Sequence, residues 1–304
     1  MSQGNAATDR LLMRAMNVSL AAGVLLLGAR IWLAAHTGSA GVLGDAAESA
    51  VHLLAVIFAS YSLRVARKPP DSSHLFGHGK AQYFSAGVEG ALISLAAMFI
   101  AFEAIRQLVA GPRLEHIGTG IAVTGAIALV NLFLGLWLLR TGRRHHSILL
   151  LANGRHVLTD VWTSGGVVIG LALAATTGQP WWDPIVALLI AANILRTGIR
   201  LVRQAVGGLM DESSPETDRL LRRILGDETQ RRDLEFHQLR HRFCGGHHWV
   251  EFHLVFPSQT TVEAAHEAAT EIERTLHHNL RPSARIITHL EPRSAAKTRE
   301  PWET

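Results

Sequence analysis

Ionisable side chains recur at a four-residue spacing within two long apolar stretches of the chain. Glu48 and His52 lie in the first stretch, and His156 and Asp160 lie in the second. Residues four apart share one face of a helix, so two facing helices would bring two imidazoles and two carboxylates to one point. Such a donor set suits a tetrahedral Zn²⁺ ion. The pattern predicts a metal site between two apolar helices; the alternative is a hydrogen-bonded network or a single interhelical ion pair.

Asp45 lies three residues before Glu48, on the same helix face. Three roles stay open for it: a carboxylate that supports the metal ligands, a group on an exit path, or a cap at the start of the helix. Four further polar residues in apolar stretches are interpreted as packing or cavity-lining groups: Glu89, Glu103, Asn131 and Asn193.

A second group of metal-ligating residue types lies in a polar segment between apolar stretches, which reads Asp71-Ser72-Ser73-His74-Leu75-Phe76-Gly77-His78-Gly79-Lys80. Asp71, His74 and His78 stand at positions i, i+3 and i+7 and supply enough ligands for a three-ligand metal site. A surface loop that happens to hold two histidines is the alternative, and the sequence leaves both open.

Composition places these residues in a membrane protein. Of 304 residues 48% are apolar and 18% are charged, whereas soluble proteins usually carry about 25% charged residues. A helix needs about 20 mostly apolar residues to cross a bilayer, and six stretches qualify: 11–35, 40–64, 82–108, 117–140, 148–177 and 183–205. The first follows a polar N-terminus without a small-residue cleavage site, so we expect a retained span.

The distribution of positive charge predicts the orientation of these spans. Basic residues gather in alternate connections: Arg64, Arg67, Lys68 and Lys80, then Arg140, Arg143 and Arg144, then Arg200 and Arg203. The other connections carry almost none, so both termini are expected in the cytoplasm. The single cysteine, Cys244, excludes an internal disulfide framework and suits a reducing compartment.

The C-terminal part is predicted to be a small soluble α+β domain. Helices are expected at 215–225 and 260–280, and strands at 234–242, 248–256 and 284–290. In the second strand, alternation buries Val250, Phe252, Leu254 and Phe256 and leaves Trp249, Glu251 and His253 on the opposite face. Residues 212–304 hold 13 Lys/Arg against 15 Asp/Glu, a balance that argues against nucleic acid as a partner.

Taken together, and most specifically through His74-Leu75-Phe76-Gly77-His78-Gly79-Lys80, the chain resembles the cation diffusion facilitator family, in particular its bacterial zinc/iron-type efflux transporters. The resemblance implies a membrane six-helix bundle plus a cytoplasmic αββαβ, metallochaperone or ferredoxin-like domain. It implies a homodimer in the bacterial inner membrane that exports divalent metal in exchange for protons. The expected boundaries are a cytoplasmic tail (1–10), a membrane domain (11–210), a metal-binding domain (211–293) and a disordered tail (294–304).

The same resemblance assigns residues. It places the transported ion at Glu48, His52, His156 and Asp160, with the order of carboxylate and imidazole on the second span reversed relative to the family's zinc branches. It also implies a salt bridge between Lys80 and Asp211, and a regulatory zinc pair at the dimer interface held by His237, His253, His266, His289 and Glu291. The remaining histidines of the tail are interpreted as solvated surface residues, with weaker metal ligands as the alternative: His241, His247, His248, His277 and His278.

We therefore expect a proton-coupled exporter that is stimulated when metal binds its cytoplasmic domain. Zn²⁺ is the first candidate cargo, and Fe²⁺, Co²⁺, Ni²⁺ and Cd²⁺ are alternatives, because imidazole ligands disfavour Mn²⁺. A non-transporting, metal-sensing membrane protein is the rival from another class. An enzyme is not expected, since the apolar stretches hold no nucleophile beside a base, and a closed four-ligand site leaves no position for a substrate water.

Overall fold

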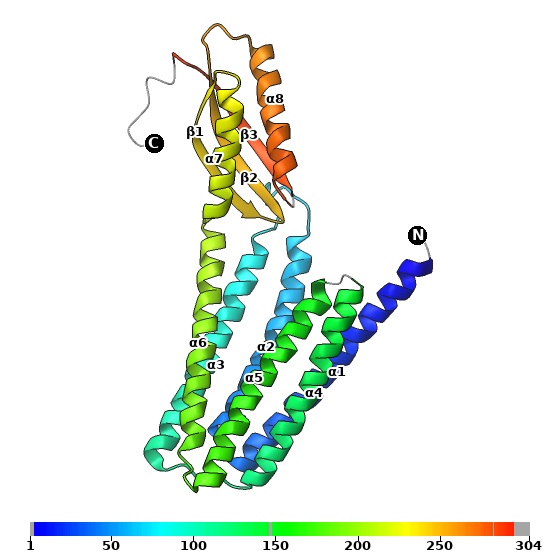
Figure 1. Cartoon of the computed structure of the whole chain (residues 1–304), viewed down its shortest axis with the longest axis vertical. Coiled ribbons are helices and arrows are strands. Elements are labelled where there is room, and N and C mark those ends of the chain that lie inside the picture. Colours follow the sequence, from blue (N-terminus) through cyan, green and yellow to red (C-terminus); the bar gives the residue numbers. More distant parts are fainter. Residues whose placement is uncertain (1–2, 146–147, 282, 295–304) are drawn as a thin grey trace. The chain divides into compact units, whose positions relative to one another are not determined.

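The computed structural model describes residues 3–145, 148–281 and 283–294 (Figure 1). They divide into two compact units. The first contains Met1–Phe58 and Val88–Val202, and the second contains Ala59–Gly87 and Arg203–Thr304. The disordered tail predicted for 294–304 lies, apart from its first residue, outside the described residues.

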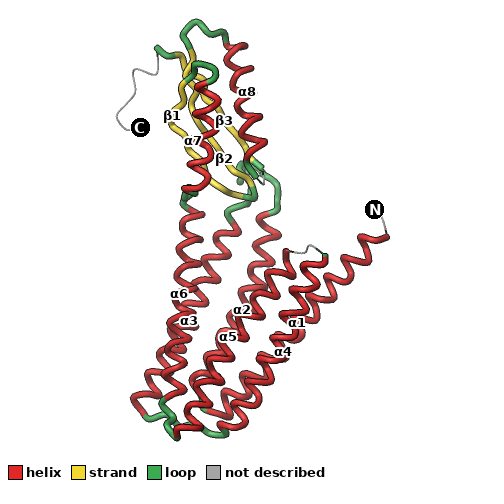
Figure 2. Tube along the Cα trace, in the orientation of Figure 1, coloured by secondary structure: helices red, strands yellow, loops and turns green. Residues whose placement is uncertain are grey.

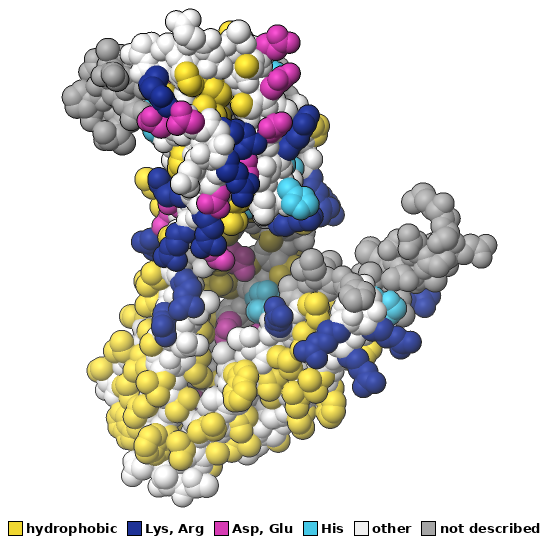
Figure 3. Space-filling view, turned by 45° about the horizontal axis from the view of Figure 1, so that its top comes forward, with side chains coloured by type: hydrophobic (Ala, Val, Ile, Leu, Met, Phe, Trp, Pro, Cys, Tyr) yellow, Lys and Arg dark blue, Asp and Glu magenta, His cyan; other side chains and the backbone are white. Residues whose placement is uncertain are grey.

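Six helices in the described residues are long and apolar enough to cross a membrane, which confirms the predicted set of spans. They are α1 (Gln3–Thr37), α2 (Ala40–Ala66), α3 (Ala81–Ala110), α4 (Ile117–Arg144), α5 (Ile148–Thr177) and α6 (Trp182–Leu209). Hydrophobic side chains cover the surface of these helices, as expected of groups that face lipid tails (Figure 3). Helix α1 extends back into residues 3–10 of the predicted N-terminal tail.

The three connections 38–39, 111–116 and 178–181 lie together at one end of the first unit, which we call the short-turn end. The backbone N–H of Glu115 donates to Thr37 O at 3.1 Å, and the side chain of Gln107 donates to Gly38 O at 3.1 Å. These bonds satisfy backbone groups where the helices end. They join the end of α1 to α3 and to the connection 111–116.

Glycines set the close approach of α5 to α4. A Cβ atom on Gly135 would meet the side chain of Leu158 at 2.8 Å, and one on Gly154 would meet Leu139 N at 3.0 Å. Small residues of this kind let membrane helices pack through their backbones. The contact fixes the part of α5 that carries His156.

Asp183 of α6 fixes the start of α2. It is 1% exposed, and its carboxylate accepts hydrogen bonds from Ser39 Oγ at 2.6 Å and from the backbone N–H of Ala40 at 2.8 Å. A carboxylate at a helix N-terminus satisfies free N–H groups and complements the helix dipole. Asp183 therefore orients the helix that carries Glu48 and His52.

We expect Asp183→Leu to destabilise the folded protein by about 1–3 kcal/mol, because it leaves two buried donors without an acceptor. Asp183→Asn retains one side-chain oxygen as an acceptor and should cost less. Thermal unfolding of the purified full-length protein in detergent measures both variants. Equal melting temperatures for Asp183→Leu and the wild type would contradict this role.

The C-terminal domain contains α7 (Pro215–Gln230), β1 (Glu235–Cys244), β2 (His247–Phe256), α8 (Val262–Asn279) and β3 (Ala284–Pro292). The strands form one sheet in the order β1-β2-β3, with β1 and β2 antiparallel and β2 and β3 parallel (Figure 2). Both helices share a core with one face of β2, built from residues that include Leu221, Leu225, Val250, Phe252, Leu254, Ile272 and Leu276. The predicted α-β-β-α-β order is confirmed, although α7 runs five residues beyond its predicted end.

An irregularity in β1 decides which face its histidines occupy. His237 pairs with His253 and His241 pairs with Val250, with a register shift between His237 and Arg240. Gln238 within the shift has a φ of 52°. A β-bulge of this kind adds a residue to one strand and reverses the alternation beyond it. His237 therefore lies on the face of the sheet that points away from the core, whereas His241 lies on the core face, beside the buried Val250.

The bulge makes the interpretation of His241 as a solvated residue wrong. Its side chain is 4% exposed, and its Nε2 lies 3.7 Å from Asp218 Oδ1 of α7. Partial burial lowers the pKa of His241. His247 and His248 are also not free surface residues, because they hydrogen-bond to Ser283 Oγ and Arg281 O. The interpretation is right for two residues near the end of α8, His277 and His278, which are exposed.

Candidate metal centres

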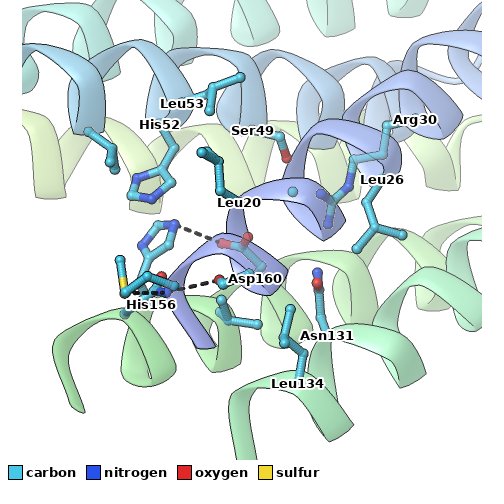
Figure 4. A pocket seen from close by; sticks show the side chains of 16 residues that line it. Leu20, Leu26, Arg30, Ser49, His52, Leu53, Asn131, Leu134, His156 and Asp160 are labelled. Atoms are coloured by element: carbon cyan, nitrogen blue, oxygen red, sulfur yellow. Dashed lines mark hydrogen bonds and ion pairs between the residues drawn. The ribbon is translucent and has the colours of Figure 1, made fainter. Parts of the chain in front are cut away.

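The structure brings the predicted ligands of α2 and α5 together. The imidazole rings of His52 and His156 stack with their centroids 3.3 Å apart and their planes 20° from parallel. His156 Nε2 lies 3.5 Å from Asp160 Oδ1, a distance too long for a strong hydrogen bond. These three side chains line one cavity between the helices, with the two histidines on one side of it (Figure 4).

Glu48 completes the predicted set from α2, one turn from His52. Its Oε2 is buried and has no hydrogen-bond partner within the described residues. Asp160 and Asp45 lie close enough to repel the ionised carboxyl group, and Arg30 lies close enough to attract it. A buried oxygen without a donor among like charges favours a cation as its partner.

The four residues are near one another, but their ligand atoms do not form a closed cage. In the described chain, candidate ligand atoms of three residues gather within 4.8 Å of one another at two other places, and not here. The stacked imidazoles would have to turn apart to direct their nitrogens at one ion.

The cavity has a volume of ≈ 100 Å³ and is lined by residues of α1, α2, α4 and α5. Arg30 and Asn131 lie on the side opposite the two histidines (Figure 4). Asn153 of α5 also lines it and donates a hydrogen bond to Ser19 Oγ at 2.9 Å. The predicted cavity-lining role of Asn131 agrees with this position.

Arg30 is the residue that sequence reasoning missed. Its Nε donates to Asp45 Oδ2 at 2.8 Å, and both side chains are 3% exposed. Ser164 Oγ of α5 lies 3.1 Å from the same Asp45 oxygen. Since α2 begins at Ala40 and is capped by Asp183, a capping role for Asp45 is wrong. An arginine within an apolar span needs a buried partner, and this signal could have led from Arg30 to Asp45.

The loop between α2 and α3 forms a second candidate metal centre. Ligand atoms of Asp71, His74 and His78 all lie within 4.8 Å of one another. Asp71 Oδ1 is 3.2 Å from His74 Nδ1, and Asp71 Oδ2 is 3.4 Å from His78 Nε2. Hydrogen bonds from the Ser73 side chain and the His74 backbone lower the pKa of Asp71 to about 2, so it is an anion at any physiological pH.

A third candidate centre lies on the open face of the C-terminal sheet. His237, His253 and His289 stand in register on β1, β2 and β3 and form a row across the strands. Glu291 joins this row: its Oε2 is 2.9 Å from His237 Nε2, and its Oε1 is 2.6 Å from His253 Nδ1. Burial alone would raise the pKa of Glu291, but the bonds to His253 and His237 outweigh it and hold that pKa low.

Ligand atoms of His237, His253 and Glu291 lie within 4.8 Å of one another. All three residues are partly buried, so this cluster is less exposed than the one in the loop between α2 and α3. His289 lies farther out, 3.6 Å from Glu291, with a side chain that is 62% exposed. His266 is exposed on α8, on a helix whose opposite side contributes Ala265 and Ala269 to the core. It is not part of the compact group.

Lys80 and Asp211 form the expected salt bridge at 3.1 Å. The sequence did not indicate its third member, Arg242 of β1, whose Nη1 lies 2.7 Å from the same Asp211 oxygen. Arg242 also lies over the rings of Phe76 and Trp249. Burial alone would raise the pKa of Asp211, but these two cations lower it. The α2–α3 loop is thereby held to strand β1 within the second unit.

Comparison with known proteins identifies the chain. Residues 16–210 match the profile described as the cation efflux transmembrane domain, and residues 222–293 match the cytoplasmic domain of cation efflux proteins. The chain belongs to the cation diffusion facilitator family. The resemblance stated from the sequence is thus confirmed, and this facilitator is a cation efflux transporter with several membrane spans and is not an enzyme.

Full-length relatives of this facilitator include a transporter of Synechocystis sp., which is 39% identical over 277 residues, or 90% of this chain and 88% of the relative. The cation-efflux pump FieF of Yersinia enterocolitica is 30% identical over 284 residues, with 91% of each chain covered. A solved structure of the Zn form of CzrB is 34% identical over 29% of this chain and 94% of its own. The TM-score of this match is 0.26.

We expect Asp71→Asn to weaken Zn²⁺ binding at the loop by about tenfold or more, because it removes the anion that contacts both histidines. Lowering the pH from neutral to mildly acidic should weaken binding in both proteins, since the histidines must be neutral to bind metal. Asp71 does not contribute to this pH dependence, because its depressed pKa keeps it ionised until the pH falls to about 2. Calorimetric titration of the full-length protein at several pH values measures both effects. A wild-type affinity that is independent of pH would contradict the assignment.

Proposed function

We propose that this cation efflux protein exports divalent transition-metal cations, Zn²⁺ foremost, in exchange for protons. The supporting observation is the arrangement of two imidazoles and two carboxylates on α2 and α5. His52, His156 and Asp160 line one cavity, and the buried carboxylate of Glu48 lies one helical turn from His52. Mixed nitrogen and oxygen donors favour Zn²⁺ over Mn²⁺. Fe²⁺, Co²⁺, Ni²⁺ and Cd²⁺ remain alternative cargoes for the same mechanism.

Proton coupling follows from the chemistry of these ligands. An imidazole or a carboxyl group binds metal only in its deprotonated form, so protons and metal compete for the same atoms. In the proposed cycle, the deprotonated site takes metal from the cytoplasm, turns outward, and releases it as protons arrive. Return of the protonated site completes an antiport cycle by alternating access.

The direction of transport rests on the proposed orientation in a bacterial inner membrane. The connections at the short-turn end carry few charges, whereas Arg140, Arg143 and Arg144 lie at the opposite end of α4. The positive-inside rule then places the short-turn end outside and both termini in the cytoplasm. The cavity extends from Arg30 along α1 to Met16, toward the cytoplasmic end.

We further propose that the protein acts as a homodimer whose C-terminal domain senses cytosolic zinc. The row of His237, His253 and His289 with Glu291 supports this role, since it offers neutral imidazoles and a carboxylate on a face that no helix covers within the described chain. Metal there would favour one arrangement of the two subunits and raise transport, which is a coupling between distinct sites. His266 would join from its exposed position on α8.

The test is metal flux into proteoliposomes of the full-length protein, with and without an acidic interior. We expect wild-type protein to move Zn²⁺ faster with the pH gradient and Asp160→Ala to lose nearly all flux, because the variant lacks a charged ligand. His36→Gln, an exposed histidine on α1, is the matched control and should keep wild-type flux. Equal flux in the wild type and Asp160→Ala would contradict the assignment of the transport site.

A membrane sensor that binds zinc without transport is the rival, and the compact cluster of the C-terminal domain is the observation that favours it. A sensor predicts that Glu291→Gln abolishes function whereas Asp160→Ala is harmless. The exporter predicts that Asp160→Ala loses transport, whereas Glu291→Gln keeps basal transport and loses only its stimulation by metal. Flux measurements at low and high metal separate the two functions, because a sensor moves no metal even as the wild type, whereas the exporter moves metal as the wild type and loses flux in Asp160→Ala.

A further inference from the structure

The metal cavity ends abruptly toward the short-turn end of the helical unit. Its lining residues on α1 run from Met16 to Arg30, those on α2 begin at Ser49, and those on α5 end at Asp160. Since α1 ends and α2 begins at the short-turn end, Arg30 marks the limit of the cavity in that direction. Beyond it, the side chains of α1, α2 and α5 that pack against one another are buried, among them Leu33, Val42 and Val167, so they form a closed segment between the site and the exterior.

The first layer of this closed segment is a charged link between three helices. Arg30 Nε of α1 donates to Asp45 Oδ2 of α2 at 2.8 Å. Ser164 Oγ of α5 lies 3.1 Å from that oxygen and 3.4 Å from Arg30 Nη2. Ser164 is 0% exposed, and Arg30 and Asp45 are 3% and 4% exposed. The link therefore connects both ligand-bearing helices to α1.

An apolar layer lies behind the link. Leu33 of α1, Val42 of α2 and two residues of α5, Val167 and Leu171, form one buried cluster in which no member is more than 1% exposed. These residues lie nearer the short-turn end than Arg30, Asp45 and Ser164 in their respective helices. An ion that leaves the site toward that end must pass the link first and the apolar layer second.

The cost of buried charge makes such a link an all-or-none contact. Removal of one partner from a buried ion pair leaves an uncompensated charge, which costs far more than the pair itself contributes. The two charges therefore stay paired as long as no water reaches them from the short-turn end. Water that enters when α1, α2 and α5 separate would solvate both charges and make the open arrangement accessible. A bistable contact of this kind is suited to a gate.

We propose that the Arg30–Asp45–Ser164 link is the outer gate of the metal site, which opens to release the ion toward the short-turn end. The inference rests on the proposed export function and extends it to residues that do not bind the ion. Asp45 keeps its carboxylate on Arg30 instead of on the metal, which leaves Glu48 and Asp160 as the two anions that balance a divalent charge. Arg30 and Asp45 are thus positioning residues.

The test measures how accessible the apolar layer is from outside. A reporter cysteine replaces Val167 in a Cys244→Ser background, and a membrane-impermeant thiol reagent is added to the outer side of right-side-out vesicles. We expect slow labelling with the intact link. Asp45→Asn removes the anion that pairs with Arg30 and leaves that buried charge uncompensated in the closed arrangement, so we expect labelling to accelerate by at least about tenfold.

A matched control removes a different ion pair of the bundle. Glu103 and Arg106 of α3 are 2.7 Å apart, and Arg106 is 61% exposed, so Glu103→Gln/Arg106→Gln should leave labelling at the wild-type rate. If Asp45→Asn does not fold, Ser164→Ala and Arg30→Lys weaken the link without removing its ion pair and should give smaller accelerations. Unchanged labelling in a folded link variant would overturn the gate.

The outcomes also separate the gate from the export function. Labelling requires no metal, so faster labelling in the link variant supports the gate even if wild-type vesicles move no metal ion. Wild-type flux together with unchanged labelling in the folded link variant would overturn the gate and leave export intact. Faster labelling together with loss of pH-driven flux would support both, because a gate that does not close prevents alternating access.

Discussion

The cost of burying charge among apolar helices sorts the polar residues of the membrane unit into two kinds. Arg30, Asp45 and Asp183 have their charge satisfied by close partners, and each connects helices. Glu48 and His156 carry buried ligand atoms that accept or donate no hydrogen bond in the described chain. The groups with close polar partners hold the helices together, and the groups without a hydrogen bond are available to a cation. Structure and proposed transport site follow from the same physical constraint.

The C-terminal domain positions its ligands by a different means, the register of its sheet. Antiparallel pairing of β1 with β2 and parallel pairing of β2 with β3 place three histidines at one level. The bulge after His237 keeps that histidine in the row and turns His241 to the core. The open face therefore collects ligands while the opposite face packs on two helices, so one short sheet serves both stability and recognition.

Much of this arrangement was predictable, since helical spacing and strand alternation are local properties. The spans, the α-β-β-α-β order and the meeting of the four-residue pairs on α2 and α5 follow from such patterns. Three features do not. The partner of Arg30 depends on which helices are neighbours, the face of His241 depends on a bulge at a residue other than glycine, and the position of Arg242 beside Asp211 joins distant segments. Each is set by tertiary contacts that no local pattern contains.

The most direct test of the central claim is the coordination of zinc at the site between α2 and α5. X-ray absorption spectroscopy would be recorded on the full-length protein carrying Asp71→Asn, His74→Gln, His253→Gln and Glu291→Gln, loaded with one equivalent of Zn²⁺. We predict a shell of two imidazole nitrogens and two carboxylate oxygens at about 2.0–2.2 Å, which His156→Gln reduces to one imidazole. A shell without imidazole, or failure of this protein to retain zinc, would contradict the account.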